Sequence, residues 1–489
     1  MLRKTLTVDA KITDFGISIE LLGKSFEIEY PKGIWEMVPS KEKQVLLENI
    51  TFANTHYLPL FLGGNKISYN TRFPLLESYF FRNQVCDLMD CETADDKPHL
   101  SYVKKLYNLD YEFREGPSTA PDETCVVREK NESQDVAILP FTFGKESLAS
   151  FAMCLELGIK PVLVYCEEPV QPFESEYKLK RLEEIRKKYG VPVYHIKNGA
   201  GLFRYGKAFP NVERTEVGWG SQTTILAMMM IPFVYAHGAK YIFFGSEYAN
   251  NEYEMKRGWK VFHSYDQTTF WTNQQDSIVQ ILTLDSCRVR STFEPIDEPN
   301  IFYMLHHRYP ELSGYHFSCF AENSLVGDSQ WCHNCYKCSR MFILAKACGI
   351  DPARIGFVED ILQKEGMFDH YLGSKYATGS AFDLDFAFYS AMKKGVKSPY
   401  IEKFEKLRMP EMKPWDWHID YFTKLKPNYN LPEKYRDGII KIFEDELSAQ
   451  IYGPVPWPRP HHRAQPWPGP ARPGADAAAG TGRQGPHHL

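Results

Sequence analysis

The stretch that decides the fold is "DVAILPFTFGKESLASFAMCLELG", residues 135–158. A short apolar run leads into a Gly-Lys pair, and apolar residues then recur with helical spacing at Leu148, Phe151 and Leu155. The pattern stops at Gly158, a residue type that commonly ends helices. Because short apolar runs are typical of strands buried in parallel sheets, the stretch predicts a strand, a tight loop and a helix.

The same alternation continues further along the chain. Two kinds of segment follow in turn: strands "KPVLVYCEE" (160–168), "VPVYHIK" (191–197) and "AKYIFFGSE" (239–247), and helices "EYKLKRLEEIRKKYG" (176–190) and "SQTTILAMMMIPFVYAHG" (221–238). Strands that alternate with helices of this length predict an α/β fold with a parallel sheet. The carboxyl ends of such strands meet at one edge, where ligands bind.

Composition changes mark the expected organisation of the chain. Strand-like alternation runs through residues 1–60, with two strands in "GISIELLGKSFEIEYP" (16–31). The sequence therefore predicts a β-rich N-terminal domain (1–115), a polar linker (116–134), the α/β domain (135–351), a helical C-terminal region (352–452) and a disordered Pro- and Gly-rich tail (453–489) that resembles an artefact.

The overall composition limits the classes of function. The chain has 489 residues, 43% of them hydrophobic and 24% charged, which is typical of a folded globular protein. A net charge of −5 gives no general attraction to nucleic acid or to an anionic membrane. The sequence contains no apolar run of membrane-spanning length and no apolar signal core at its start. We therefore expect a cytoplasmic protein that does not bind a membrane, and its overall charge does not favour nucleic acid as a partner.

The loop between the first parallel strand and its helix, residues 141–147, has the features of an anion site. Backbone N–H groups and the positive end of the helix dipole converge there, and Lys145 adds a positive charge. The loop matches neither the Walker A motif nor G-x-G-x-x-G. The residues alone leave two interpretations open, a phosphate-binding loop and an ordinary strand-to-helix turn.

A second signal is a group of four cysteines within "SCFAENSLVGDSQWCHNCYKCSR" (318–340). They are Cys319, Cys332, Cys335 and Cys338, and two-residue spacers separate the last three. Such spacing lets thiolates converge on one tetrahedral ion, and four thiolates leave no open position. The pattern predicts a structural zinc site, with an iron–sulfur cluster as the alternative. We expect His333, which lies inside the motif, to be exposed or to cap a turn.

The loop resembles that of a known superfamily. "TFGKES" (142–147) is similar to the S-G-G-x-D-S pyrophosphate loop of the N-type ATP pyrophosphatases, also called PP-loop enzymes. Thr142 stands in place of Ser, Phe143 in place of the first Gly, and Glu146 in place of Asp. The resemblance implies a Rossmann-like core and an enzyme that cleaves ATP between its α and β phosphates to adenylate a substrate.

Two families of this superfamily share the cysteine pattern. The arrangement S-C…C-x2-C-x2-C-x-R resembles that of the 7-cyano-7-deazaguanine synthases, and "WCHNCYKC" (331–338) resembles a motif of the UDP-N-acetylmuramoyl-L-alanyl-L-glutamate epimerases. The epimerase resemblance extends over residues 1–350 and includes "FFGSEYANNEYEMKRGWKVFHSYDQT" (243–268), in which Glu247 and His263 match. Tyr248 replaces an expected Arg, and Tyr336 an expected Pro.

The resemblances imply roles for individual residues. We expect pyrophosphate to be held by Thr142, Phe143, Gly144, Lys145, Glu146 and Ser147, with Glu146 also near Mg2+. Gly245, Ser246 and Glu247 end a predicted strand and so lie at the ligand edge, where Lys145, Glu247 and His263 are the catalytic candidates. Tyr265 and Asp266 are weaker candidates for proton transfer, and Trp219 and Gly220 for an adenine pocket. For each of these residues a purely structural role stays open.

The sequence thus favours an enzyme that uses ATP and Mg2+ to adenylate a small-molecule or sugar-nucleotide carboxylate, with structural Zn2+. The nearest resemblance implies inversion at the glutamate α carbon, as in peptidoglycan biosynthesis. The alternatives are a deazaguanine-type amidating ligase, a tRNA-modifying PP-loop enzyme and, from another class, a degenerate nucleotide-binding protein. The degenerate alternative would be favoured if Phe143 filled the phosphate position.

Overall fold

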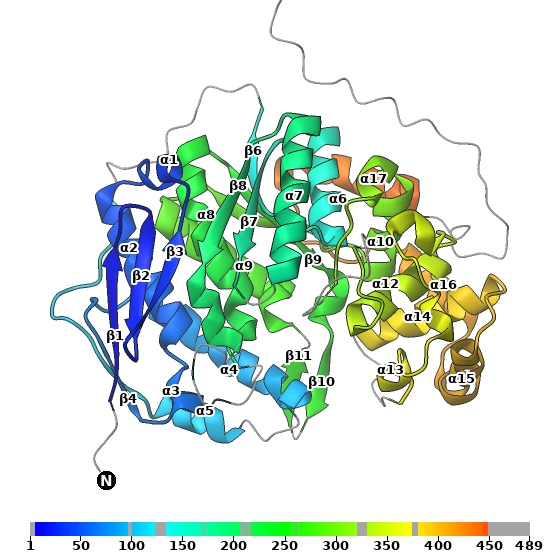
Figure 1. The fold of residues 1–489 in the computed structure, drawn as a ribbon, viewed down its shortest axis with the longest axis horizontal. Helices are drawn as coiled ribbons and strands as arrows, with labels where there is room; N and C mark the ends of the chain where they lie inside the picture. Colours follow the sequence, from blue (N-terminus) through cyan, green and yellow to red (C-terminus); the bar gives the residue numbers. More distant parts are fainter. Residues whose placement is uncertain are drawn as a thin grey trace, which may run out of the picture.

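The structure, a computed structural model, describes residues 5–95, 100–122, 134–169, 172–205, 209, 212, 217–256, 258–262, 264–319, 330–373 and 380–447. One large sheet runs through the molecule, with helices on both faces (Figure 1). Its ten strands, in spatial order, are β12 (Arg288–Phe293), β9 (Tyr241–Glu247), β6 (Val136–Pro140), β7 (Lys160–Glu167), β8 (Val193–Asn198), β3 (Lys24–Glu29), β2 (Gly16–Leu21), β1 (Thr5–Ile12), β4 (Lys66–Tyr69) and β5 (Asp110–Glu112).

The five strands from β12 to β8 are parallel, which confirms the predicted α/β fold. All four predicted strands are present as β6, β7, β8 and β9, while β12 was not predicted. Chain order runs from β6 through β7 to β8 on one side, and from β9 to β12 on the other. The strand order therefore reverses between β6 and β9, and ligands of such sheets commonly bind at a point of this kind.

The strands of the N-terminal unit extend this sheet. β3 pairs antiparallel with the outer parallel strand β8, through Ile28 opposite Asn198 and Glu29 opposite Lys197. The expectation of strand-like structure throughout residues 1–60 was wrong for Ser40–Thr55, which forms helix α2. Every residue from Val45 to Thr55 of this helix is buried, so its sequence has no one-sided apolar pattern by which a helix could be recognised.

Each face of the sheet has its own hydrophobic core. Ala137 and Leu139 of β6 point into one core, and Val136 and Ile138 into the other, because successive side chains of a strand alternate. The first core is shared with α6 (Lys145–Glu156), α7 (Pro172–Tyr189), α10 (Glu298–His307), α11 (Pro310–Ser313) and α12 (Tyr336–Ala347). The second is shared with α1 (Lys32–Trp35), α2, α3 (Pro59–Leu62), α4 (Glu77–Asp95), α5 (Leu100–Tyr107), α8 (Gln222–His237) and α9 (Thr269–Thr283).

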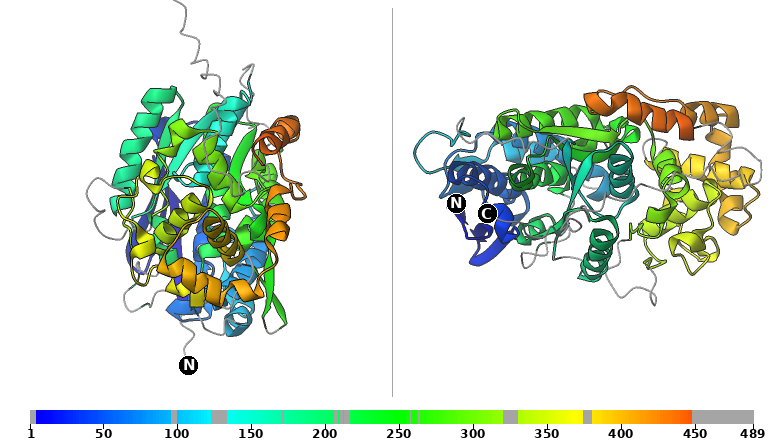
Figure 2. Two further views of the ribbon diagram at one scale, coloured as in Figure 1. Left: turned by 90° about the vertical axis from the view of Figure 1, so that its right-hand side faces the viewer. Right: turned by 90° about the horizontal axis from the view of Figure 1, so that it is seen from above.

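The described residues after 351 form only helices, as predicted, and pack on the first core. They are α13 (Asp369–Gly373), α14 (Ser380–Lys393), α15 (Pro399–Leu407), α16 (Trp415–Thr423) and α17 (Arg436–Glu446), with short 3₁₀ turns between them. Figure 2 shows these helices gathered at the end of the molecule away from the N-terminal strands. Most of the predicted linker, residues 123–133, and the whole tail, 453–489, lie outside the described residues.

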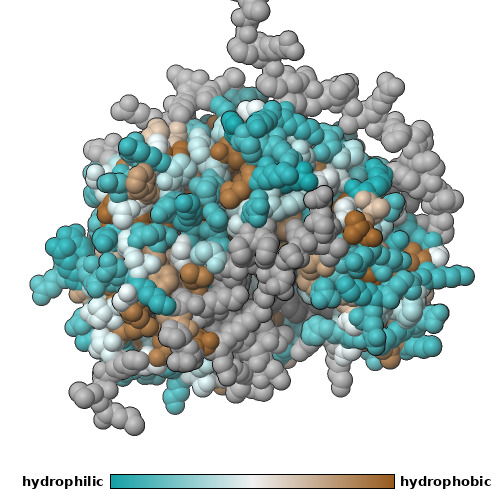
Figure 3. Space-filling view, in the orientation of Figure 1, coloured by the Kyte–Doolittle hydropathy of each residue, from teal (hydrophilic) through white to brown (hydrophobic). Residues whose placement is uncertain are grey.

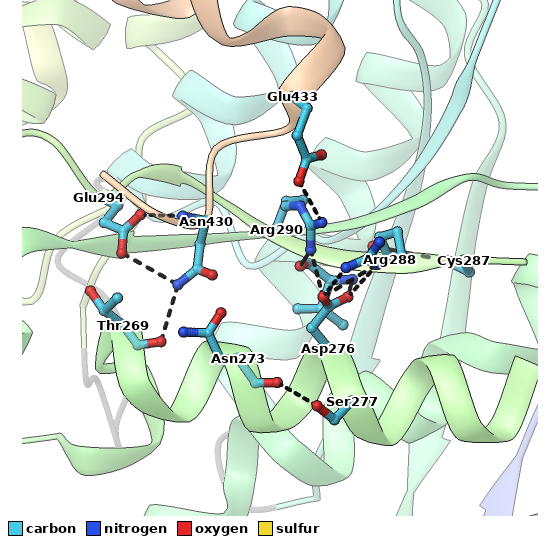
Figure 4. Close-up of polar contacts among 11 residues, drawn as sticks. Thr269, Asn273, Asp276, Ser277, Cys287, Arg288, Arg290, Glu294, Asn430 and Glu433 are labelled. Atoms are coloured by element: carbon cyan, nitrogen blue, oxygen red, sulfur yellow. Dashed lines mark hydrogen bonds and ion pairs between the residues drawn. The ribbon is translucent and has the colours of Figure 1, made fainter. Parts of the chain in front are cut away.

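The last part of the chain also covers the outer edge of β12 (Figure 4). Ser291 N donates to Asn430 O at 3.0 Å, and the side chain of Glu294 accepts from Asn430 N at 2.6 Å. An ion pair of 2.9 Å joins Arg290 to Glu433. Since an exposed edge strand invites pairing with other chains, this segment protects the edge of the sheet next to β9.

On the face drawn in Figure 3, apolar side chains are scattered in small groups among hydrophilic ones. Within the described parts of the chain, no helix has the length and hydrophobicity needed to cross a bilayer.

Candidate functional site

The predicted phosphate loop lies where the strand order reverses. It leaves β6 and enters α6, whose first residue is Lys145, while the neighbouring strand β9 ends at Glu247. Ser147 Oγ donates to Gly144 O at 3.1 Å and accepts from Thr142 N at 3.4 Å. These two hydrogen bonds hold the loop against the first turn of α6. The side chain of Thr142 is exposed.

The ring of Phe143 lies in the hydrophobic core and does not fill the loop. The side chain is fully buried and contacts Phe141 edge-to-face, with ring centroids 4.8 Å apart. Its backbone has φ 63°, a left-handed conformation that glycine adopts most easily. The burial of a phenyl ring, commonly about 3–5 kcal/mol by truncation, exceeds a left-handed penalty of about 1–2 kcal/mol. Phe143 thus adopts a backbone conformation that favours glycine, and its side chain anchors the loop in the core.

Lys145 is buried in the first turn of α6 among acidic side chains. Its Nζ contacts Glu146 and lies 2.8 Å from Glu298 Oε1 of α10. Burial by itself would lower the pKa of Lys145, but the carboxylates of Glu146, Glu298 and Glu247 outweigh it and raise this pKa above its usual value. Lys145 is therefore a fixed positive charge at the start of α6.

Glu298 joins the lysine to α12, the helix that contains Cys338. Arg340 of α12 makes close contacts with Glu298 Oε2, and its NH2 lies 3.5 Å from Asp383 Oδ2 of α14. Burial would raise the pKa of Glu298, but Arg340 and Lys145 reverse this and lower it. Burial, together with the charges of Glu247 and Glu298, raises the pKa of Asp383 well above its usual value. A C-terminal helix thus contributes to the charge balance around the loop lysine.

The end of β9 lies against the first turn of α6. A Cβ on Gly245 would lie 2.4 Å from Glu146 Cβ, so glycine is required for β9 and α6 to approach this closely. Ser246 O accepts a hydrogen bond of 2.7 Å from Ser291 Oγ of β12. Gly245 therefore allows β9 to pack closely on α6, and the carbonyl of Ser246 joins β9 to β12.

Glu247, the last residue of β9, is an acidic group with a strongly raised pKa. Its Oε2 is buried and has no hydrogen-bond partner among the described residues. Burial is the main influence, and it raises the pKa of Glu247 to about 8, with Lys145 opposing and Glu298 and Glu146 adding to the effect. A carboxyl group with this pKa changes protonation near neutral pH.

The remaining proton-transfer candidates are not brought to the lysine by any described contact. His263 lies outside the described residues. Asp266, in the 3₁₀ turn Tyr265–Gln267, accepts from Thr223 N at 3.2 Å and Thr223 Oγ1 at 2.8 Å, and so caps α8. Burial raises the pKa of Asp266 to about 7, against the lowering effect of the Thr223 hydrogen bonds. Tyr265 is buried against Trp271, with ring centroids 5.5 Å apart.

Trp219 and Gly220, proposed for an adenine pocket, lie in the 3₁₀ turn Trp219–Ser221 that precedes α8. Gly220 N donates to Asp87 Oδ1 of α4 at 2.6 Å, and a Cβ on Gly220 would lie 2.4 Å from that oxygen. The guanidinium of Arg204 stacks over the Trp219 ring at 5.9 Å. These contacts give the turn a structural role in joining α8 to α4.

The four cysteines converge as predicted and form a group that could hold a metal ion. The Sγ–Sγ distances are 3.8 Å for Cys319–Cys335, 3.7 Å for Cys332–Cys338, 3.5 Å for Cys335–Cys338 and 3.7 Å for Cys338–Cys319. A tetrahedral zinc ion about 2.3 Å from each sulfur separates neighbouring sulfurs by about 3.8 Å. The donor set and its spacing therefore fit a metal such as zinc.

Backbone N–H groups donate hydrogen bonds to two of these sulfurs, which favours their thiolate form. Cys332 N donates to Cys319 Sγ at 3.3 Å, and Cys338 N donates to Cys335 Sγ at 3.4 Å. His333 is buried rather than exposed, and its Nε2 accepts from Val358 N at 3.0 Å. The histidine therefore holds the turn between the cysteines to the segment that follows α12.

Three residues of this site were not predicted from the sequence. Arg340 lies within the cysteine motif, two positions after Cys338, so its spacing was a usable signal. Glu298 and Asp383 belong to helices without a motif, and only the fold brings them to Lys145 and Arg340.

Comparison with known proteins assigns the chain to no family. No protein-family model matches the chain, and no curated protein is significantly similar to it.

Proposed function

We propose that this protein is an ATP-dependent enzyme of the PP-loop type, which adenylates a substrate carboxylate and releases pyrophosphate. One observation carries the proposal: Lys145, at the start of α6, lies among Glu146, Glu298 and Glu247 where the order of the parallel strands reverses. With β6 counted as the first strand, the order is 3-2-1-4-5, as in Rossmann-like sheets that bind nucleotides at this point.

The loop residues suit the charge that develops in this reaction. A substrate carboxylate oxygen bonds to the α phosphorus of ATP, the bond to the β phosphate breaks, and pyrophosphate leaves with the electron pair. A lysine ammonium has three N–H donors, and contacts with Glu146 and Glu298 use two of them. The third donor and the N–H groups at the start of α6 can bind the departing phosphate.

The chain has a carboxylate that suits Mg2+ bound together with ATP. Mg2+ commonly binds one or two carboxylates together with nucleotide phosphates, and it would neutralise phosphate charge in the reaction. Glu146, whose carboxylate contacts Lys145, would hold it. The four cysteines would hold Zn2+ in a structural role, because four thiolates leave no position open for a substrate.

Glu247 favours inversion as the step that follows. An acyl-adenylate makes the neighbouring Cα–H more acidic, and a carboxylate with a pKa of about 8 can accept that proton near neutral pH. This supports a reaction similar to that of the UDP-N-acetylmuramoyl-L-alanyl-L-glutamate epimerases. Amidation of the adenylate, as in the 7-cyano-7-deazaguanine synthases, is the alternative sequel.

The test is isotope exchange between labelled pyrophosphate and ATP in the presence of Mg2+ and UDP-N-acetylmuramoyl-L-alanyl-L-glutamate. Adenylation predicts exchange that requires the carboxylate and is lost in Lys145→Met but not in Lys441→Met, a control at an exposed lysine. Chiral analysis of the recovered glutamate then separates inversion from amidation. Wild-type protein that binds ATP but shows no exchange with this or other carboxylates would overturn the proposal.

A further inference from the structure

A chain of buried hydrogen bonds leads through two histidines to the phosphate loop. His306 Nδ1 lies 2.5 Å from Ser313 Oγ, and His306 Nε2 lies 3.1 Å from His316 Nδ1. His316 Nε2 then lies 3.0 Å from Ser318 Oγ. The four side chains form one continuous path from the end of α11 to Ser318.

The path ends directly beside the loop. Phe317 N donates to Phe143 O at 2.9 Å, which pairs this segment with the loop backbone. Ser318 Oγ lies 3.8 Å from the position that a Cβ on Gly144 would occupy. The Ser318 hydroxyl is therefore next to the N-terminus of α6, where the proposed phosphate would bind.

Both imidazoles are fixed and neutral. His316 is fully buried and contacts Trp331 edge-to-face, with ring centroids 5.3 Å apart, while His306 packs on Phe302 at 4.3 Å. Burial lowers the pKa of His306 to about 3. Burial, with the influence of His306 and Lys145, lowers the pKa of His316 well below its usual value.

A neutral imidazole has one N–H donor and one acceptor nitrogen, so the chain can run in only two directions. In one direction, Ser318 donates to His316, His316 to His306, and His306 to Ser313. In the other, Ser313 donates to His306 Nδ1, His306 Nε2–H donates to His316, and His316 Nε2–H donates to Ser318. The second direction leaves the Ser318 proton free to bond to a group at the loop.

We infer that Ser318 is a further anion-binding residue of this site, which donates its hydroxyl proton to a phosphate oxygen held by the loop. The His306–His316 pair, with both rings in the Nε2–H tautomer, holds this direction and so acts as a positioning element. The inference rests on the proposed function, because it takes pyrophosphate or a nucleotide phosphate as the ligand. No net proton leaves the chain, since each donor along it keeps one proton.

Calorimetric titration with inorganic pyrophosphate tests the binding part. A hydrogen bond to a charged group predicts roughly ten-fold weaker binding in Ser318→Ala. Ser313→Ala, which is remote from the ligand, should weaken binding several-fold through the histidines. Ser390→Ala, at a buried serine bonded to Ala347 O, should leave it unchanged. Unchanged affinity in Ser318→Ala overturns this inference alone, whereas wild-type protein that binds neither pyrophosphate nor ATP overturns the proposed function with it.

Nitrogen-15 NMR of histidine-labelled protein gives a signature that a structural role would not produce. With pyrophosphate bound, His306 and His316 should both be the Nε2–H tautomer, with signals assigned through the shifts caused by Ser313→Ala and Ser318→Ala. An Nδ1–H tautomer at His316 in the complex would contradict the inference, because Ser318 would then donate to the ring.

Discussion

The Nζ atom of Lys145 lies 2.8 Å from Glu298 Oε1, so a buried ion pair joins the loop between β6 and α6 to α10. Arg340 contacts the second oxygen of the same carboxylate and lies two residues after Cys338 on α12. The lysine is thus held in place through a residue of the helix that carries the cysteine site. This relationship makes the orientation of Lys145 depend on α12.

Arg340→Lys should therefore weaken anion binding at the loop, although the variant keeps the positive charge. The planar guanidinium holds Glu298 while reaching Asp383, a geometry that an ammonium cannot reproduce. We expect at least ten-fold weaker pyrophosphate binding, measured by calorimetry, with metal content unchanged. Arg340→Met should also lower the free energy of unfolding in urea by about 3–5 kcal/mol, because it removes one of the two cationic partners of the buried Glu298 carboxylate.

The control for the arginine variants is Arg186→Lys, which alters an exposed ion pair with Glu183 and should have little effect on either measurement. Full pyrophosphate affinity in Arg340→Lys would show that Lys145 is positioned without α12.

Gly245→Ala should separate β9 from α6. The added methyl group would lie 2.4 Å from Glu146 Cβ, and both atoms belong to regular elements that yield little. We expect a loss of about 1–3 kcal/mol in the free energy of unfolding and weaker nucleotide binding. Gly33→Ala, where a Cβ meets nothing within 4 Å, is the matched control. Equal stability of the two variants would contradict the close approach described here.

Glu247→Gln should change how stability depends on pH. Because the folded pKa of Glu247 is raised to about 8, the folded protein holds this proton more tightly than the unfolded chain does. Wild-type stability should therefore fall as pH rises from about 5 through 8, at up to about 1.4 kcal/mol per pH unit from this group. The glutamine variant should lose less stability over the same range.

Thermal unfolding at pH 5.5 and 8.5 measures the difference. Glu254→Gln, at a residue of the hairpin β10 (Tyr253–Lys256) and β11 (Trp259–Phe262), serves as the control. Identical pH dependence in wild type and Glu247→Gln would mean that this carboxyl group ionises normally.

Metal analysis tests the cysteine site. Purified protein should contain about one zinc ion per chain without visible absorption, whereas an iron–sulfur cluster would be coloured. Cys338→Ser should lose the metal and unfold at lower temperature. Cys154→Ser, at a buried cysteine of α6 outside the group, should retain it. Metal-free wild-type protein with unchanged stability would rule out a structural metal.

The parallel core could be predicted because its signals are local. The apolar runs of β6, β7, β8 and β9 and the helical spacing after Gly144 each lie within one short segment. The spacing of the last three cysteines is local in the same way, and it correctly indicated that the four sulfurs converge.

Contacts between distant segments could not be predicted in this way. Glu298 is 153 positions from Lys145, and no local pattern distinguishes it from a surface acid in the first turn of a helix. Burial of Phe143 also depends on the core around it, since its sequence position alone allowed the ring to block the loop. The sequence thus indicated the loop, while the electrostatic environment of its lysine required the tertiary structure.

The most direct test of the central claim is phosphorus-31 NMR of the products formed from ATP, Mg2+ and UDP-N-acetylmuramoyl-L-alanyl-L-glutamate. We predict AMP and pyrophosphate with the wild-type protein, and neither with Lys145→Met. Formation of ADP and inorganic phosphate would contradict the account, because the β–γ bond of ATP would then be the one that the loop at Lys145 helps to break.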